Sequence, residues 1–301
     1  MRMKEISIIF KCLKQLISAS ERAQKCGMNG DVIMWKWEAI GQPRAVAVIF
    51  HSAYEHHAWY AWLIEKLRHE GFHVVTGDLP GHGEEYKYLR QHNEDFADYY
   101  RFAKQLMEVA MNESLPVFVI GNGLGALLAV RTIIRNQFEV AGIILSSPWM
   151  QLKLHPGKLP KTFMTISAFP SSMKLKHDLS FEDITSNIEA QLEMKDDIPF
   201  NTLVTVKWYN ELQSLMKLLK TYNEVCLPNI PVLLMTGGAD RIIDANATVQ
   251  WLFAQKLTFF QYREWKQANH NLYLEIERDD VFKMTKDFMN SASRMLGYIT
   301  E

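Results

Sequence analysis

From residue 31 onward, short apolar runs alternate with longer segments whose apolar residues recur at helical spacing. Apolar runs of four to eight residues are typical of strands buried on both faces, and apolar positions three and four apart are typical of amphipathic helices. The predicted strands cover residues 31–38, 45–51, 73–78, 116–120, 140–146, 231–236 and 258–264. The predicted helices cover residues 57–69, 96–111, 126–135 and 280–296. This alternation predicts an α/β fold: a mostly parallel central sheet with helices on both faces.

Residues 151–210 interrupt this alternation. The interval contains Pro156, Pro160 and Pro170, charged segments and two helical patterns, but no apolar run comparable to the other strands. The pattern favours an insertion that lies over one end of the sheet as a helical cap or lid. The core would then consist of residues 31–150 and 211–301.

Residues 1–30 differ from the rest and form a basic amphipathic N-terminal segment. Apolar residues recur at helical spacing between Ile8 and Ile17, and residues 1–26 carry a net charge of +4. A basic amphipathic helix can lie on an anionic membrane surface, so one interpretation is peripheral membrane contact through residues 1–27. An ordinary surface helix and a native start at Met28 are the alternatives. The longest apolar stretch is too short for a signal peptide.

Composition narrows the class of protein further. The chain has 301 residues, a net charge of −1 and 48% hydrophobic residues. Such a chain can bury a large core, and it has no basic excess with which to neutralise nucleic-acid phosphates. No apolar run is long enough for a transmembrane helix. Cys12, Cys26 and Cys226 are scattered and odd in number, which indicates a reducing, cytoplasmic setting without a disulfide framework.

The turn Gly121–Ala126, between a predicted strand and a predicted helix, fits two chemistries. Gly121, Gly123 and Ala126 match the dinucleotide fingerprint G-x-G-x-x-G/A, whereas Gly121 and Gly125 match the nucleophile elbow G-x-S-x-G with Gly123 at the serine position. A dinucleotide site needs an acidic residue at the end of the next strand, but that strand ends in Ser146. Dinucleotide binding therefore remains a minor alternative to the elbow.

The elbow interpretation finds partners in the expected chain order. Asp240 follows one predicted strand and His270 follows the next, so both lie at carboxyl ends of strands, where open α/β sheets place their sites. The Asp would orient the His, and the His would act as general base. The loop after an early strand and the residue after the nucleophile would supply oxyanion-hole N–H groups, here those of Ala53 and Leu124.

Neither a metal nor a cofactor is expected. Glu55, His56 and His57 are adjacent, but no HExxH pattern and no second ligand cluster accompany them.

Over roughly residues 31–297, the chain resembles a known family, the α/β hydrolases of the bacterial lysophospholipase and monoacylglycerol lipase group. The matching segments are HSAYEHHAWY at 51–60, GDLPGHG at 77–83, GNGLGA at 121–126, SSP at 146–148, TGGAD at 236–240 and NHNLYLE at 269–275. The resemblance implies a parallel-sheet core with a helical cap, and substrates that are lipid-like esters of fatty acids.

The departures from the family pattern concern the chemistry itself. Gly123 stands where the family has its nucleophilic Ser, Asn122 replaces a His, and Ser52 and Tyr54 replace two Gly of the oxyanion loop. Without a hydroxyl at 123, no acyl-enzyme can form there. We therefore expect an impaired carboxyl-ester hydrolase or, alternatively, a pseudoenzyme that binds a lipid-like ligand or a protein partner. Departures in several motifs favour natural divergence over a single engineered change.

The start of the expected cap is rich in large apolar side chains. Such residues are suited to an acyl-chain pocket, although core packing would explain them equally well. The residues concerned are Trp149, Met150, Phe163, Met164, Phe169 and Met173.

Overall fold

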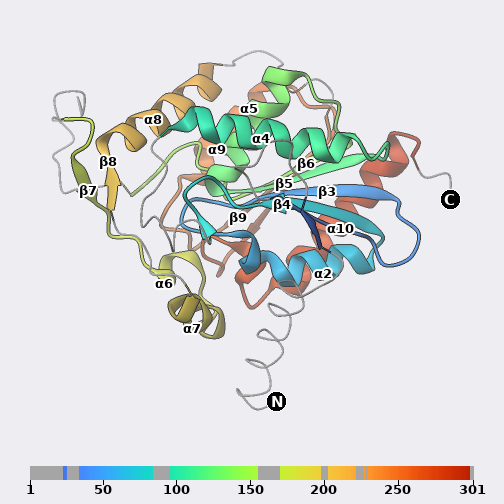
Figure 1. Cartoon of the computed structure of the whole chain (residues 1–301), viewed down its shortest axis with the longest axis horizontal. Helices are drawn as coiled ribbons and strands as arrows, with labels where there is room; N and C mark the ends of the chain where they lie inside the picture. The colour runs from blue at the N-terminus through green and yellow to red at the C-terminus, as the bar shows by residue number, and fades with distance from the viewer. Residues whose placement is uncertain are drawn as a thin grey trace.

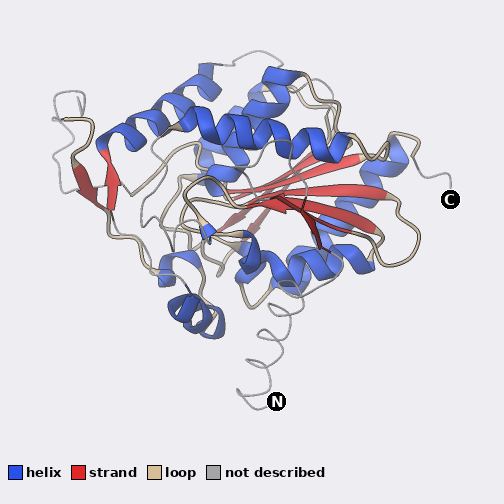
Figure 2. Cartoon of the chain, viewed as in Figure 1, coloured by secondary structure: helices blue, strands red, loops and turns tan. Residues whose placement is uncertain are grey.

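An eight-stranded sheet with the order β1-β2-β4-β3-β5-β6-β9-β10 forms the centre of the molecule (Figures 1 and 2). The computed structural model describes residues 23–25, 34–83, 95–154, 170–197, 203–221, 227 and 230–298. The strands are β1 (Ala23–Lys25), β2 (Met34–Trp37), β3 (Ala45–Phe50), β4 (Phe72–Gly77), β5 (Val117–Asn122), β6 (Gly142–Ser146), β9 (Val232–Gly237) and β10 (Phe260–Trp265). The strands from β4 to β10 run parallel, and β2 pairs antiparallel with both β4 and β1. The predicted fold class is confirmed.

Helices cover both faces of this sheet. Their bounds are η1 (His57–Tyr60), α2 (Ala61–His69), α4 (Phe96–Met111), α5 (Gly123–Asn136), α6 (Phe181–Ile184), α7 (Ile188–Asp197), α8 (Val206–Thr221), α9 (Ala245–Ala254), η4 (Leu272–Leu274) and α10 (Arg278–Met295). In Figure 1, α4, α5 and α8 lie above the sheet, and α2 and α10 lie below it. Helix α9 packs into the same cluster as α4 and α5.

Strand β3 shows why its sequence is apolar at every position. Val46, Val48 and Phe50 contribute to the cluster that includes α4 and α5. The intervening residues Ala45, Ala47 and Ile49 contribute to the cluster that includes α2 and α10. Because successive side chains of a strand point to opposite faces, a strand covered on both sides must be apolar throughout.

Most of the predicted elements are found within a few residues of their expected bounds. Helix α5 starts at Gly123 instead of Ala126, because the chain turns directly from β5 into the helix with Asn122 as its extended N-cap residue. Helix α9 was not predicted. In its sequence, ANATVQWLFA, apolar and small residues lie around most of the helix, so there is no clear apolar stripe from which a helix could be predicted.

The interval expected to form a cap contains more structure than predicted. Strands β7 (Lys174–Lys176) and β8 (Leu203–Thr205) form a separate antiparallel pair, which lies at the left of Figure 1. Of the three residues of β7, only Leu175 is buried, so the strand carries almost no apolar signal. Helix α8 begins directly after β8 and runs to Thr221, across residue 210, where the sequence placed the end of the cap.

Most of the N-terminal segment lies outside the described residues, including the expected helix and its membrane contact. Within residues 1–30, the structure describes only β1, which pairs with β2 at one edge of the sheet. No helix in the described part of the chain combines the length and apolarity that a membrane span requires.

Candidate active site

The Gly-rich turn between β5 and α5 forms a sharp elbow. Gly123 has a left-handed backbone with φ +51°. A Cβ on Gly125 would lie 2.4 Å from the carbonyl oxygens of Phe50 and His51, and one on Gly121 would lie 2.5 Å from the Cα of Ala126. The glycines thus let the elbow backbone press against β3 and against the first turn of α5.

The space beside Gly123 is already filled. A Cβ at this position would lie 2.0 Å from Ser52 Oγ and 2.9 Å from Trp149 Nε1. Both distances are too short for a real contact. The volume that a nucleophilic side chain would occupy is therefore taken by a hydroxyl from the loop after β3 and an indole from the loop after β6.

Asp240 and His270 come together as the sequence predicts. Asp240 Oδ2 lies 2.8 Å from His270 Nδ1, and both residues are buried. The other carboxylate oxygen accepts the backbone N–H groups of Ile242 and Ile243 (2.7 and 3.2 Å), which fixes the carboxylate. Burial alone lowers the pKa of His270, but the charge of Asp240 and the hydrogen bond to it outweigh burial, and the pKa is raised above its ordinary value.

The indole of Trp149 is hydrogen-bonded to Nε2 of His270, the nitrogen that would act as a general base. The indole N–H donates this hydrogen bond of 2.9 Å. Because Nδ1 faces Asp240, Nε2 is the atom that would take the proton from a nucleophile. A backbone hydrogen bond from Trp149 to the carbonyl of Gly123 (3.2 Å) holds the indole beside the elbow.

The expected oxyanion hole is occupied as well. The backbone N–H of Leu124 donates to Ser52 Oγ at 3.1 Å. Ala53 is buried in the same loop, directly after Ser52. The next residue, Tyr54, has φ +67°, a conformation that glycine adopts more readily than tyrosine. The hydroxyl of Ser52 therefore lies where one donor of an oxyanion hole would receive its ligand.

A buried carboxylate supports this arrangement. Glu55 Oε2 accepts hydrogen bonds from the backbone N–H of Ser52 (2.8 Å) and the hydroxyl of Tyr60 (2.5 Å). Its Oε1 accepts from the side-chain amides of Asn122 (3.0 Å) and Asn271 (2.8 Å). One carboxylate thus links the loop after β3 to η1, to the end of β5 and to the loop that carries His270.

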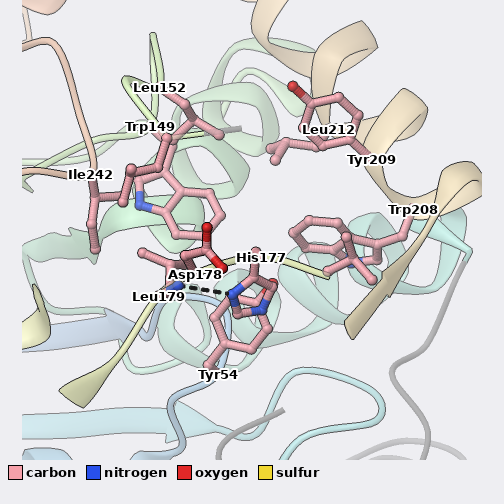
Figure 3. Close-up of a pocket in the computed structure, with 12 residues that line it drawn as sticks. Tyr54, Trp149, Leu152, His177, Asp178, Leu179, Trp208, Tyr209, Leu212 and Ile242 are labelled. Atoms are coloured by element: carbon pink, nitrogen blue, oxygen red, sulfur yellow. Dashed lines mark hydrogen bonds between the residues drawn. The ribbon is translucent and has the colours of Figure 1, made fainter. Parts of the chain in front are cut away.

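A cavity of about 60 Å³ opens beside Trp149. Figure 3 shows Trp149, Leu152 and Ile242 facing Trp208, Tyr209 and Leu212 of α8 across it, with Tyr54, His177 and Asp178 on a further side. The backbone N–H of Leu179 donates to His177 Nδ1 at 3.3 Å. The walls are thus mainly apolar and aromatic, and polar groups are concentrated on one side.

Sequence reasoning missed several residues of this site. Trp149 was expected as a wall of an acyl pocket or as core packing; it lines the cavity, and it is also a partner of His270, which was not expected. Of the other residues expected at that pocket, Met150 and Met173 do not line it, and residues 163, 164 and 169 lie outside the described part of the chain. The only local signal for the role of Trp149 is its place just after the end of β6, beside the elbow.

Comparisons with known proteins agree with this architecture. Residues 41–277 match the family Hydrolase_4, described as serine aminopeptidase, S33. Phospholipase YtpA of Bacillus subtilis is 34% identical over 262 residues, which cover 85% of this chain and 98% of that protein. The human monoglyceride lipase is 26% identical over 246 residues, covering 80% of each chain.

Solved structures show the same fold. The monoacylglycerol lipase of Paleococcus ferrophilus superposes with a TM-score of 0.72 at 20% identity and covers 88% of this chain and 100% of its own. A monoglyceride lipase of Saccharomyces cerevisiae, solved with a substrate analogue, gives a TM-score of 0.71 at 16% identity, with 89% and 94% covered. Together with the parallel sheet, the elbow and the Asp240–His270 pair, these matches show that the chain belongs to the Hydrolase_4 family of α/β hydrolases.

Proposed function

We propose that this protein binds a lipid-like ester, or the fatty acid derived from one, without forming an acyl-enzyme at residue 123. The observation that carries the proposal is the hydrogen bond from Trp149 Nε1 to His270 Nε2. A histidine whose basic nitrogen already accepts a proton donor is not available as a general base.

Two further features point in the same direction. Gly123 has no side chain that could act as a nucleophile. The backbone N–H of Leu124, an expected oxyanion-hole donor, already donates to the Ser52 hydroxyl. Covalent ester hydrolysis needs a nucleophile, a free base and an open oxyanion hole at once. The proposed loss of covalent activity therefore rests on all three of these features and not on a single residue.

The cavity supports a lipid-like ligand. Apolar residues such as Leu152 and Ile242 line it beside aromatic side chains of α8, and Trp149 separates it from His270. An apolar pocket with few polar groups is typical of a site for a hydrocarbon chain. The similar proteins that are named a phospholipase and a monoglyceride lipase suggest the ligand class.

A second function is slow hydrolysis by a water molecule that His270 activates. The intact hydrogen bond between Asp240 and His270 favours it, because this pair would still orient a general base if Trp149 moved away.

Binding and hydrolysis are measured separately. Displacement of a fluorescent fatty acid by monoacylglycerol or lysophospholipid measures binding. We expect Leu179→Asp, a charge in the half-buried cavity wall, to weaken binding about tenfold or more, because a carboxylate beside a hydrocarbon chain loses hydration. Leu192→Asp, on the exposed face of α7, is the matched control and should bind as the original protein does.

Hydrolysis of p-nitrophenyl butyrate separates the two functions. We expect turnover by the unaltered protein to equal that of His270→Ala. A rate that disappears in His270→Ala would establish the water mechanism instead. Trp149→Phe removes the indole donor, so a gain of His270-dependent turnover in that variant would identify Trp149 as the block. If neither lipid displaces the probe, the binding proposal is wrong.

A further inference from the structure

Two histidines and two aspartates form a cluster next to the elbow site but apart from the Asp240–His270 pair. His57 Nδ1 lies 2.8 Å from Asp78 Oδ1, and His56 Nε2 lies 2.8 Å from Asp197 Oδ2. Donor atoms of His56, His57 and Asp78 all lie within 4.8 Å of one another. The proposed lipid-binding function makes no use of these side chains.

We propose that His56, His57 and Asp78 bind a divalent transition-metal ion, with Zn²⁺ as the best fit. Imidazole nitrogen and carboxylate oxygen are ligand types that Zn²⁺ prefers. In a tetrahedral Zn²⁺ site with bonds of about 2.1 Å, neighbouring ligand atoms lie about 3.4 Å apart. His57 Nδ1 and Asp78 Oδ1 are 2.8 Å apart, and no two donor atoms of the three residues are more than 4.8 Å apart, so each separation is within about 1.4 Å of that value. Small side-chain rotations therefore suffice to admit the ion.

Charge and burial favour a cation here. The side chains of Asp78 and Asp197 are 11% and 17% exposed, and those of His57 and His56 are 13% and 8% exposed. Two largely buried carboxylates in one cluster need compensating positive charge. A divalent ion supplies it while the two imidazoles stay neutral, the form in which they bind metals.

The surroundings already hold the ligands in place. The backbone N–H of His57 donates to Asp78 Oδ1 at 2.7 Å, and the His57 ring stacks on Trp35 with centroids 3.8 Å apart. Asp197 accepts from the His56 ring and from the indole of Trp59 (3.2 Å). Carboxylates that orient a ligating imidazole are a regular feature of metal sites.

The position of the cluster gives the ion a structural role. His56 lies in the loop after β3, His57 is the first residue of η1, Asp78 follows β4, and Asp197 is the last residue of α7. An ion at this point would tie the segment after β3 to the loop after β4, and α7, part of the proposed cap, would be held to it indirectly, through the hydrogen bond between Asp197 and His56. It would also stiffen the loop that carries Ser52 and Glu55.

Isothermal titration of untagged, metal-stripped protein with Zn²⁺ tests the proposal. We expect one ion per chain, a higher melting temperature with Zn²⁺, and at least about tenfold weaker binding in His57→Gln and His56→Gln. His69→Gln, at an exposed position of α2, is the matched control and should bind Zn²⁺ as the unaltered chain does. Melting curves without metal show whether each variant folds.

Cobalt substitution gives a measurement that needs no variant. The unaltered chain with Co²⁺ should show a ligand-field spectrum of nitrogen and oxygen ligands without a thiolate charge-transfer band. Absence of saturable Zn²⁺ binding, equal affinity in His57→Gln and His69→Gln, or a thiolate band would each overturn the proposal. Hydrolysis and lipid displacement play no part in this test, so its failure leaves the proposed function untouched.

Discussion

At the residue scale, a neighbouring hydroxyl fills the space that a side chain at position 123 would need. Ser52 Oγ lies 2.0 Å from the place where a Cβ on Gly123 would be, and it accepts the Leu124 N–H. The resemblance places a glycine of the oxyanion loop at position 52. Measured against the pattern that the resemblance implies, serine and glycine would have exchanged places, and in this chain Ser52 takes the space that a side chain at 123 would fill.

This exchange predicts that restoring Ser at position 123 alone does not restore activity. In Gly123→Ser, the new side chain collides with Ser52 Oγ and strains a left-handed backbone. We expect a stability loss of about 1–3 kcal/mol and no labelling by a fluorophosphonate probe. In Gly123→Ser combined with Ser52→Gly, the collision with Ser52 Oγ is gone, and the close contact that remains is the one with Trp149 Nε1. We expect the new side chain to push the indole away from His270 Nε2, and ester hydrolysis at least about tenfold above the single variant, with the base reaching the new hydroxyl.

Two controls accompany that comparison. Ser52→Gly alone should stay inactive because it has no nucleophile, and His270→Ala should abolish any gain in the double variant. If Gly123→Ser alone hydrolyses p-nitrophenyl butyrate as fast as the double variant, Ser52 is not an obstruction.

At the scale of elements, the site depends on loops that follow neighbouring parallel strands. The loops after β3, β5, β6, β9 and β10 meet at one edge of the sheet, because parallel strands present their carboxyl ends together. Glu55 connects loops from several of these strands in a single buried network. Burial and the neighbouring Glu55 charge raise the pKa of Tyr60 well above its usual value, so Tyr60 stays a donor to this carboxylate.

The network predicts a large effect for a small change at Glu55. In Glu55→Gln, an amide NH₂ replaces one carboxylate oxygen and faces donors that previously bonded to it. We expect the free energy of unfolding to fall by about 2–4 kcal/mol in urea denaturation. Glu108→Gln, on the exposed side of α4, should change it by less than about 0.5 kcal/mol. Equal losses in both variants would show that Glu55 does not hold the loops together.

The same loops show where sequence reasoning succeeds and where it stops. The positions of most strands along the chain, and the placement of Asp240 and His270 just after two of them, follow from periodicity, because burial on both faces leaves a strong local pattern. The hydrogen bond from Trp149 to His270 joins residues 121 positions apart and leaves no periodic trace. The occupation of the Leu124 N–H by Ser52 is likewise a matter of packing between loops, which only the folded chain reveals.

At the scale of the whole molecule, two buried histidines, His51 and His82, are held in their neutral form. His51 Nε2 accepts the backbone N–H of Leu79 (2.8 Å), and His51 Nδ1 bonds to the carbonyl of Ser52 (2.7 Å). Burial, together with the neighbouring His82, lowers the pKa of His51 to about 3. Burial lowers the pKa of His82 to about 4. Both residues resist protonation in the folded state, whereas in the unfolded chain they titrate near the ordinary value of 6.5.

This difference predicts acid sensitivity. Between pH 6.5 and about 4 the unfolded chain binds protons that the folded chain excludes, so stability falls with pH by up to about 1.4 kcal/mol per unit for each of the two histidines. The raised pKa of His270 acts with the opposite sign. Its stabilisation is complete below the unfolded pKa and is lost only as pH rises through the folded value, so it does not mask the acid effect.

Urea unfolding at successive pH values between 7 and 4 measures this slope. In His82→Gln the side-chain amide can still donate to the carbonyl of Pro80, as His82 Nδ1 does at 3.2 Å. Of the two histidines, only His51 then remains as a group that binds a proton in the unfolded chain and excludes it in the folded one. We therefore expect about half the dependence on pH. His69→Gln, on the surface of α2, should keep the full slope. If His82→Gln shows the same slope as the unaltered protein, the acid sensitivity has another origin, because a buried neutral His82 must contribute to it.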